Sequence, residues 1–166
     1  MADRKTVVDS LTLTYTGVFS VNELYRIMDK WFREKGFDKY EKRSCEQVYK
    51  DSSQVDIEWE PWKKINDYAR IVMRVFFYFT DIKEVTIVKD HHKVKLNQAT
   101  VRIVFNTYLE SDWEGKWKRT PFLYMLRVIF DQYIYKYQLD QYYTFAADDT
   151  MLLYNFVKTY LNMHRY

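Results

Sequence analysis

The stretch that decides the fold is YARIVMRVFFYFT, residues 68–80. Every second residue from Ala69 to Phe79 is apolar, whereas the opposite set includes Arg70 and Arg74. A period of two is typical of a β-strand with one buried face. We therefore predict a long central strand here. We expect it to contain a twist or a bulge, because it is longer than most strands.

Shorter segments with similar alternation surround this strand and predict the rest of a sheet. They are residues 6–15, 39–50, 55–60, 83–88, 93–96 and 99–109. The first is expected to end at Gly17, and the second is polar on both sides, as is typical of an edge strand. Residues 62–67 are predicted to be a connecting loop, and residues 83–96 a hairpin around Asp90-His91-His92.

The first helix has the most complete signals in the chain. Ser20 and Glu23 form an S-x-x-E capping box, in which each residue satisfies a free amide at the helix start. An apolar stripe at helical spacing follows, and Gly36 then suits the left-handed position that ends many helices. We predict a helix over residues 21–35.

Two further helices are predicted near the end of the sequence. Thr120-Pro121 supplies a cap and a first-turn proline for a helix over residues 122–139. This helix is apolar around most of its circumference, so we expect it to be buried. Asp148 or Asp149 is expected to cap a last helix.

The predicted order of elements is β-α-β-β-β-β-β-β-α-α, which indicates an α+β fold in a single domain over residues 1–166. We expect a meandering antiparallel sheet of about five to seven strands, with about three helices. The order is similar to that of the helix-grip folds, in which a curved sheet wraps a long C-terminal helix, and this is a likeness of fold alone. The expected core consists of Leu24, Ile27, Trp31, Ile57, Ile71, Met73, Val75, Phe77, Val101, Ile103, Leu126 and Ile129.

Composition narrows the classes of function. The chain contains 16 Tyr, 11 Phe and 5 Trp but only 3 Gly, so glycine-rich phosphate loops are nearly excluded. A formal net charge of +3 is too small to indicate nucleic-acid binding by itself. The single cysteine excludes an internal disulfide and suits a reducing compartment. Neither a signal peptide nor a membrane span is expected, so we predict a soluble, cytoplasmic protein.

Three groups of residues could carry chemistry, and each has a plainer structural explanation. His91 and His92 could bind a metal, but zinc takes three or four ligands and an adjacent pair fits a solvated turn. Cys45 could be a nucleophile, but no positioned base is evident. The carboxylates of residues 56–60 could act in acid–base catalysis, yet a hairpin with the next strand would pair them with its arginines. We expect no catalytic residue, no metal and no cofactor, and hence no enzyme.

The outer face of the sheet is the main candidate for binding. Arginines and aromatic residues alternate on the side of the central and last strands that points away from the core, namely Tyr68, Arg70, Arg74, Phe76, Tyr78, Arg102 and Tyr108. A second aromatic group, Trp113 and Trp117, lies among lysines in the following loop. Such surfaces occur in protein interfaces and in platforms that stack single-stranded nucleic acid. The remaining alternative is that the chain covers them itself.

We therefore expect a non-enzymatic binding or assembly module that acts through aromatic-rich protein contacts as a homo-oligomer. Two alternatives remain open. One is a carrier of an apolar small molecule held between the sheet and the C-terminal helices. The other is binding of single-stranded nucleic acid by the arginine and tyrosine side chains of the sheet face.

Overall fold

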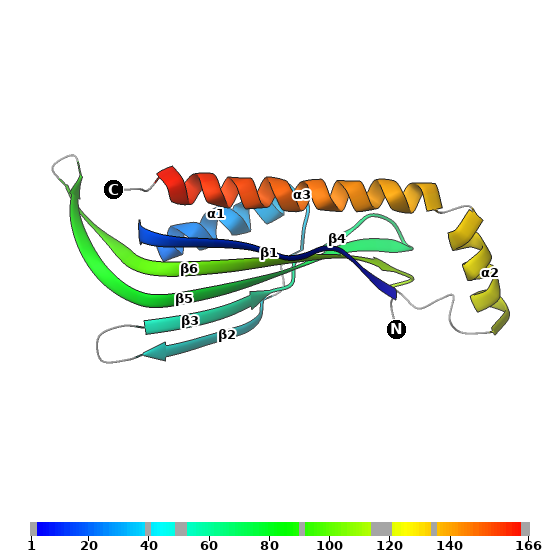
Figure 1. The fold of residues 1–166 in the computed structure, drawn as a ribbon, viewed down its shortest axis with the longest axis horizontal. Helices are drawn as coiled ribbons and strands as arrows, with labels where there is room; N and C mark the ends of the chain where they lie inside the picture. The colour runs from blue at the N-terminus through cyan, green and yellow to red at the C-terminus, as the bar shows by residue number, and fades with distance from the viewer. Residues whose placement is uncertain are drawn as a thin grey trace.

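Three long strands lie side by side in an antiparallel sheet, and two helices cover one of its faces (Figure 1). The computed structural model describes residues 3–38, 41–48, 53–89, 92–113, 121–133 and 136–163. The elements in chain order are β1 (Asp3–Phe19), α1 (Val21–Glu34), β2 (Glu41–Val48), β3 (Ser53–Trp59), β4 (Trp62–Lys64), β5 (Ala69–Lys89), β6 (His92–Ser111), α2 (Pro121–Tyr133) and α3 (Lys136–Met163). The strands follow the order β1-β6-β5-β3-β2, and β4 pairs with β5. The predicted α+β fold with an antiparallel sheet is confirmed.

β5 is the central strand that the alternation predicted. Its odd-numbered residues from Ala69 to Phe79 are at most 1% exposed, while Arg70 and Arg74 point to the opposite face. The strand has 21 residues and continues past Thr80. An irregularity in pairing follows Thr80, where Asp81 has a φ of 56°, and it bends the strand without ending it. The expected bulge is thus present.

Three predicted strand boundaries are wrong. β1 runs through Gly17, which pairs with Ala99. A Cβ at Gly17 would lie 2.7 Å from the Tyr15 hydroxyl, so the glycine allows a close approach and does not break the strand. The loop predicted at residues 62–67 contains β4. Residues 83–88 and 93–96 are not separate strands, because they form the distal parts of β5 and β6.

α1 begins and ends close to the predicted residues. The Ser20 hydroxyl accepts a hydrogen bond of 3.2 Å from the backbone amide of Glu23. At the other end Gly36 has a φ of 75°, and the amide of Phe37 donates to the carbonyl of Phe32 at 2.8 Å. This is the Schellman ending for which glycine is the preferred residue. The rings of Phe32 and Phe37 also meet edge to face.

The C-terminal helices differ most from the prediction. The helix expected over residues 122–139 is the shorter α2, and α3 then runs for 28 residues straight through the predicted caps, Asp148 and Asp149. Asp149 is almost fully buried in mid-helix, and its carboxylate lies 3.3 Å from the Lys35 ammonium group. It is therefore the partner of the lysine that caps the C-terminal end of α1, and it does not itself cap a helix.

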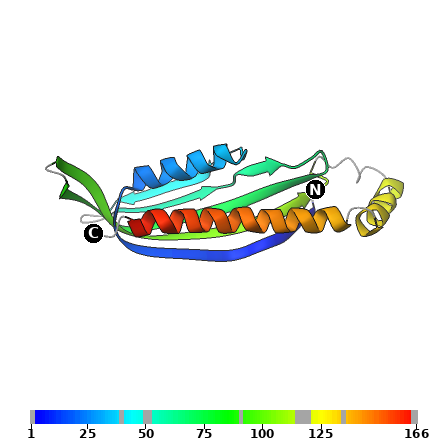
Figure 2. The same ribbon diagram turned by 90° about the horizontal axis from the view of Figure 1, so that it is seen from above.

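The core lies between the sheet and the two helices α1 and α3. α3 supplies its C-terminal part through Leu139, Ala146, Leu153, Val157 and Leu161. Leu126 and Ile129, which we expected in the core, are 38% and 46% exposed because α2 lies beyond the end of the sheet (Figures 1 and 2). Of the other predicted core residues, Ile27 and Ile57 are half-buried and the rest are buried.

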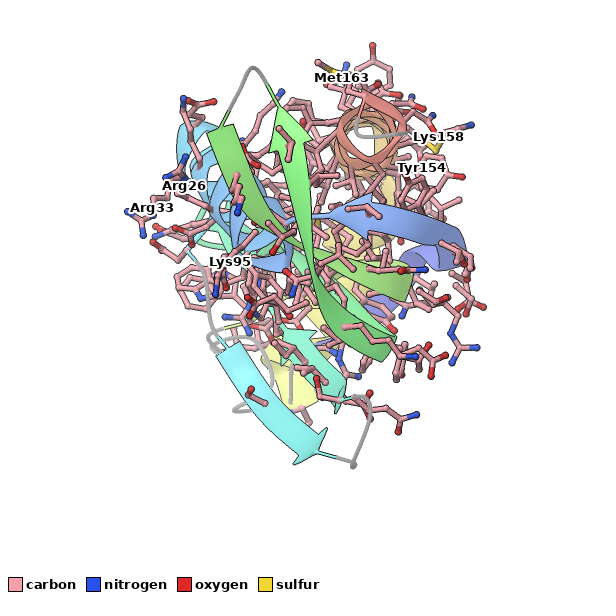
Figure 3. The ribbon with its side chains drawn as sticks, turned by 90° about the vertical axis from the view of Figure 1, so that its left-hand side faces the viewer. Arg26, Arg33, Lys95, Tyr154, Lys158 and Met163 are labelled. Carbon is pink, nitrogen blue, oxygen red and sulfur yellow. The ribbon has the colours of Figure 1, made fainter. Side chains whose placement is uncertain are left out.

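α1 and α3 lie next to each other above the sheet. The Tyr160 hydroxyl of α3 donates to the Glu23 carboxylate of α1 at 3.2 Å. Seen from the end that carries the β5–β6 hairpin, Arg26 and Arg33 project from the outer side of α1 (Figure 3). Tyr154 and Lys158 lie on the flank of α3 that points away from α1 (Figure 3). α3 thus has two distinct flanks, one toward α1 and one toward solvent above β1.

Candidate binding surfaces

The outer face of the sheet carries rows of side chains that cross several strands. One row contains Arg4 of β1, Glu110 of β6 and Arg70 of β5, which are direct cross-strand partners. In another row Arg102 of β6 lies next to Tyr78 of β5. Successive side chains of a strand point to opposite faces, so these residues share the face without helices. We call it the sheet face.

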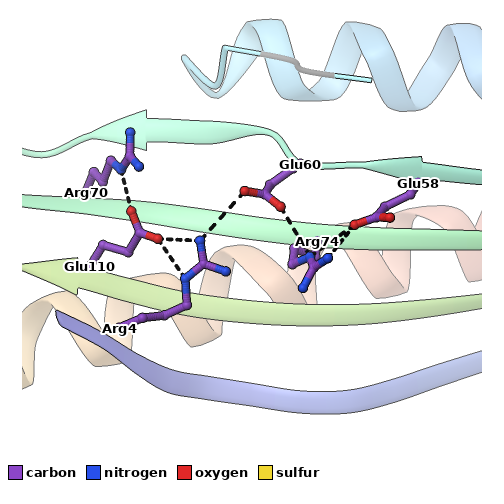
Figure 4. A network of polar contacts seen from close by, with 6 residues as sticks. All are labelled: Arg4, Glu58, Glu60, Arg70, Arg74 and Glu110. Atoms are coloured by element: carbon purple, nitrogen blue, oxygen red, sulfur yellow. Dashed lines mark hydrogen bonds and ion pairs between the residues drawn. The ribbon is translucent and has the colours of Figure 1, made fainter. Parts of the chain in front are cut away.

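Glu110 is the centre of the first row (Figure 4). Its side chain is only 3% exposed. Its Oε1 atom accepts a hydrogen bond of 2.7 Å from Nε of Arg4, and its Oε2 atom accepts one of 2.6 Å from Nε of Arg70. Two guanidinium groups thus supply the opposite charge and the donors that a buried carboxylate requires.

Glu60, which follows β3, connects this row to Arg74, because its carboxylate lies 3.7 Å from the Arg4 guanidinium and also pairs with Arg74 (Figure 4). The Arg74 guanidinium lies 2.5 Å from the Glu58 carboxylate and 3.2 Å from that of Glu60. The hydrogen bond to Glu58 is the main reason that the pKa of Arg74 is raised above its ordinary value. Glu58 and Glu60 therefore form the expected charge ladder with Arg74, whereas Arg70 pairs with Glu110 instead.

Aromatic rings stack on the same arginines. The guanidinium of Arg70 lies 5.5 Å from the centre of the Trp62 ring and 5.3 Å from that of Trp113. The guanidinium of Arg102 lies 4.8 Å from the Tyr78 ring. Two further pairs are Arg4 with Tyr108 and Arg74 with Phe76. Cation–π contacts of this kind hold the arginine side chains flat over the sheet.

Of the predicted site residues, one lies in the core and the position of another is not described. Tyr68 is 9% exposed and belongs to the core, and Trp117 lies outside the described residues. The prediction in turn missed Arg4 and Glu110. The alternation that selected Tyr108 also places Glu110 on this face, so that signal was present in the sequence.

The sheet face is closely covered by its own side chains, and most of its described cations are already paired with carboxylates. Val72, which the alternation places there, is only 1% exposed. Arg4, Arg70 and Arg74 are paired with Glu58, Glu60 and Glu110, and Lys64, the cross-strand partner of Arg70, is paired with Asp67. A single-stranded nucleic acid is held by a surplus of positive charge. This arrangement favours intramolecular cover or a protein contact over a nucleic-acid platform.

The other chemical candidates fall largely outside what the structure describes. His91 lies outside the described residues, and so do the side chains of His92 and Cys45. Among the side chains that are described, no three from His, Cys, Asp or Glu gather closely enough to hold a metal ion. In the same part of the chain, no helix combines the length and the apolar character that crossing a membrane requires.

A second surface, which we did not predict, is the outward side of α2. Six large apolar side chains are between 38% and 78% exposed: Phe122, Met125, Leu126, Val128, Ile129 and Tyr133. Leu123 and Phe130, which lie elsewhere on the helix circumference, are half-buried. The six exposed side chains form what we call the α2 face. A helix that is apolar around most of its circumference is usually buried. Here no described part of the chain covers these six side chains.

A third surface is the flank of α3 that faces α1 and β4. It contains a hollow of about 440 Å³ near the start of α3 and another of about 400 Å³ further along the helix. Lys63, Ile65 and Phe145 line the first, and Trp31 and Phe156 the second. We call this surface the α3 groove. Its apolar character is not apparent from the sequence, because the predicted helices over residues 122–139 and after Asp148 or Asp149 leave Gln141 and Phe145 outside any helix.

Comparison of the chain with family models, with curated proteins and with solved structures finds no match. Function is therefore inferred from the three surfaces themselves.

Proposed function

We propose that this protein is a non-enzymatic binding or assembly module, acting through aromatic-rich protein contacts as a homo-oligomer. The observation that carries the proposal is the exposure of the α2 face. Its six side chains together leave on the order of 600 Å² in contact with water, given that a large side chain has roughly 150–250 Å² of surface. This is at the upper end of the roughly 300–600 Å² that the largest apolar patch of a monomeric protein typically covers, and such patches are often functional.

The chemistry of the α2 face favours another protein surface as its partner. None of its six side chains carries a charge, and two of them, Phe122 and Tyr133, are aromatic. The centres of protein interfaces are depleted in charge and enriched in aromatic residues and methionine. A reducing compartment fits the chain's single cysteine, and the proposal therefore places the assembly in the cytoplasm.

Sedimentation velocity of the full chain and of one α2 variant tests this proposal. Ile129→Glu is expected to weaken self-association by about tenfold or more, because it buries a charge without a partner in the contact. Met151→Glu is the matched control, since Met151 is 45% exposed on α3 but lines neither hollow of the α3 groove. Circular dichroism checks that both variants remain folded.

A chain that stays monomeric up to roughly 1 mM contradicts the homo-oligomer, because even a weak association of about −4 kcal/mol would be visible there. Equal weakening by Ile129→Glu and Met151→Glu would exclude the α2 face as the contact surface.

The hollow beside β4 favours a second candidate, a carrier of an apolar small molecule. Its volume of about 440 Å³ lies in the range of ligand pockets, and it sits between a strand of the sheet and α3. Lys63 and Lys64 at its edge would favour an apolar ligand with an anionic group. Mass spectrometry of the solvent-extracted protein distinguishes the two candidates, since a carrier releases a stoichiometric small molecule and a purely assembling protein does not.

A further inference from the structure

We infer that the α2 face of one copy lies in the α3 groove of a second copy. This inference rests on the proposed function, because it names the surface that the α2 face contacts. It starts from two apolar surfaces of one chain that are both exposed, one of them convex and the other concave.

The α3 groove has the form of a site that binds an amphipathic helix. Phe145, Leu152 and Phe156 are 48%, 52% and 41% exposed, and their spacing of seven and four residues places them along one side of α3. Trp31 of α1 and Ile65, which follows β4, form the opposite wall. Recognition of a helix in a groove relies on apolar anchors spaced along such a surface.

The length of α2 agrees with the length of the groove. α2 has 13 residues, which corresponds to about 20 Å at 1.5 Å per residue. Gln141 lines the first hollow and Thr159 the second, and they are 18 positions apart, or about 27 Å along the helix axis. The whole of α2 therefore fits between these two residues.

The charges at the rim favour one direction of the bound helix. Lys35 is paired with Asp149 at 3.3 Å, and Lys64 with Asp67 at 2.5 Å. Lys63 makes no ion pair with any described residue, and its ammonium group lies over aromatic rings. The C-terminal end of a helix carries a partial negative charge. We therefore expect the C-terminal end of α2 to lie next to Lys63.

A second copy is the occupant that accounts for both surfaces. Within one chain α2 lies beyond the end of the sheet, and its exposed face does not fill its own groove (Figures 1 and 2). The α2 face and the three groove side chains together expose on the order of 900 Å² per copy, close to the roughly 800 Å² per partner of a standard interface. A reciprocal two-fold exchange covers both surfaces on both copies. A contact between two α2 faces would leave both grooves exposed.

Disulfide cross-linking between two different single-cysteine proteins tests the arrangement. Both carry Cys45→Ser to remove the natural thiol; one then carries Gln132→Cys in α2 and the other Gln141→Cys in the groove. Both glutamines are exposed, so the core is unchanged. With a tag on one protein to separate the masses, oxidation by copper–phenanthroline should give the mixed dimer well in excess of either homodimer. Lys158→Cys is the matched control, because Lys158 is exposed on the opposite flank of α3 (Figure 3).

The outcomes separate this inference from the proposed function. An excess of the Gln132→Cys homodimer indicates that two α2 faces meet, which overturns the inference and leaves the proposed function standing. If sedimentation shows a dimer but the mixed cross-link does not exceed that of the Lys158→Cys control, the inference is likewise overturned and the proposed function still stands. A monomer overturns both, and a monomer that binds vesicles containing phosphatidylglycerol assigns the α2 face to a lipid surface instead.

A pair of charge variants gives an independent test. Ile129→Glu damages the α2 face, and Phe156→Glu damages the groove, so each alone is expected to weaken self-association by about tenfold or more. An equimolar mixture of the two still offers one intact α2 face and one intact groove. We expect the mixture to associate more tightly than either variant alone, and a mixture no tighter than its components contradicts the inference.

Discussion

Glu110 shows how a carboxylate can be almost fully buried on a sheet face that no described helix covers. The two strands on either side of β6 place Arg4 and Arg70 directly opposite it, and both guanidinium groups donate to its carboxylate. Trp62 and Trp113 then stack on Arg70. The arginines and rings together exclude water from the carboxylate. The folded state can therefore keep Glu110 charged and buried only while both arginines remain next to it.

We predict that Glu110→Gln lowers the free energy of unfolding by about 2–3 kcal/mol, measured by urea denaturation. The amide keeps the shape of the side chain but removes its charge, so two partly buried arginines lose their shared partner. The matched control is Glu84→Gln, which breaks the exposed 2.7 Å pair with Lys95 and should cost at most about 1 kcal/mol. Similar losses for the two variants would show that burial of Glu110 does not strengthen its ion pairs.

Residue alternation predicted which side chains share the sheet face but not which of them pair. The period of two placed Arg70, Arg74, Phe76 and Tyr78 on one side of β5, as observed. The pairing depends on the register between strands, and Glu110 is separated from its partners by 40 and 106 positions in the chain. Nothing local in the sequence determines such a register, because it results from how whole strands align.

At the scale of elements, a pair of buried hydroxyl groups joins α3 to β6. Thr107 is 1% exposed and Thr150 is fully buried, and their Oγ1 atoms lie 2.6 Å apart. The Thr150 hydroxyl donates its only proton to the carbonyl of Ala146 at 2.8 Å. The Thr107 hydroxyl is therefore the donor in the bond between the two threonines.

Because Thr107 donates this hydrogen bond to Thr150, we predict that two similar substitutions lower the stability by unequal amounts. Thr150→Val leaves the Thr107 hydroxyl buried without its acceptor and should cost about 2 kcal/mol, whereas Thr107→Val leaves Thr150 with its own acceptor and should cost under about 1 kcal/mol. The double variant should be more stable than Thr150→Val alone, because no hydroxyl is then left without a partner. Thermal and urea unfolding of the three variants measure this cycle. Equal losses of unfolding free energy for the two single variants would contradict the assignment of the Thr107 hydroxyl as the donor.

The long α3 was not predictable from local signals. Asp148 and Asp149 precede an apolar run, which is the usual pattern of a helix start. Whether such an aspartate caps a helix or lies inside one depends on its partner, and Asp149 pairs with Lys35 at the C-terminal end of α1. The exposure of the α2 face could not be predicted from the sequence either. An apolar pattern indicates which side chains a helix could bury, but not whether another surface is present to cover them.

At the scale of the whole molecule, the α2 face and the β5–β6 hairpin lie at opposite ends of the sheet (Figure 1). Ile82 is the last residue of β5 that packs against the core. Beyond it, Val88 and Val94 are 69% and 38% exposed. A two-stranded hairpin without a covered face contributes little stability of its own. The folding unit therefore ends near the irregularity at Asp81, although the strands continue.

We predict that replacing residues 85–96 by Asn-Gly leaves the rest of the molecule folded. Glu84 and Asn97 are direct cross-strand partners, so a two-residue turn can join them in register. The free energy of unfolding should fall by no more than about 1–2 kcal/mol, because none of the described residues in the deleted segment belongs to the core. Self-association should be unchanged, because α2 is at the far end. Phe79→Ala is the comparison: one fully buried side chain should cost about 3–5 kcal/mol. A shortened chain less stable than Phe79→Ala would show that the hairpin belongs to the cooperative core after all.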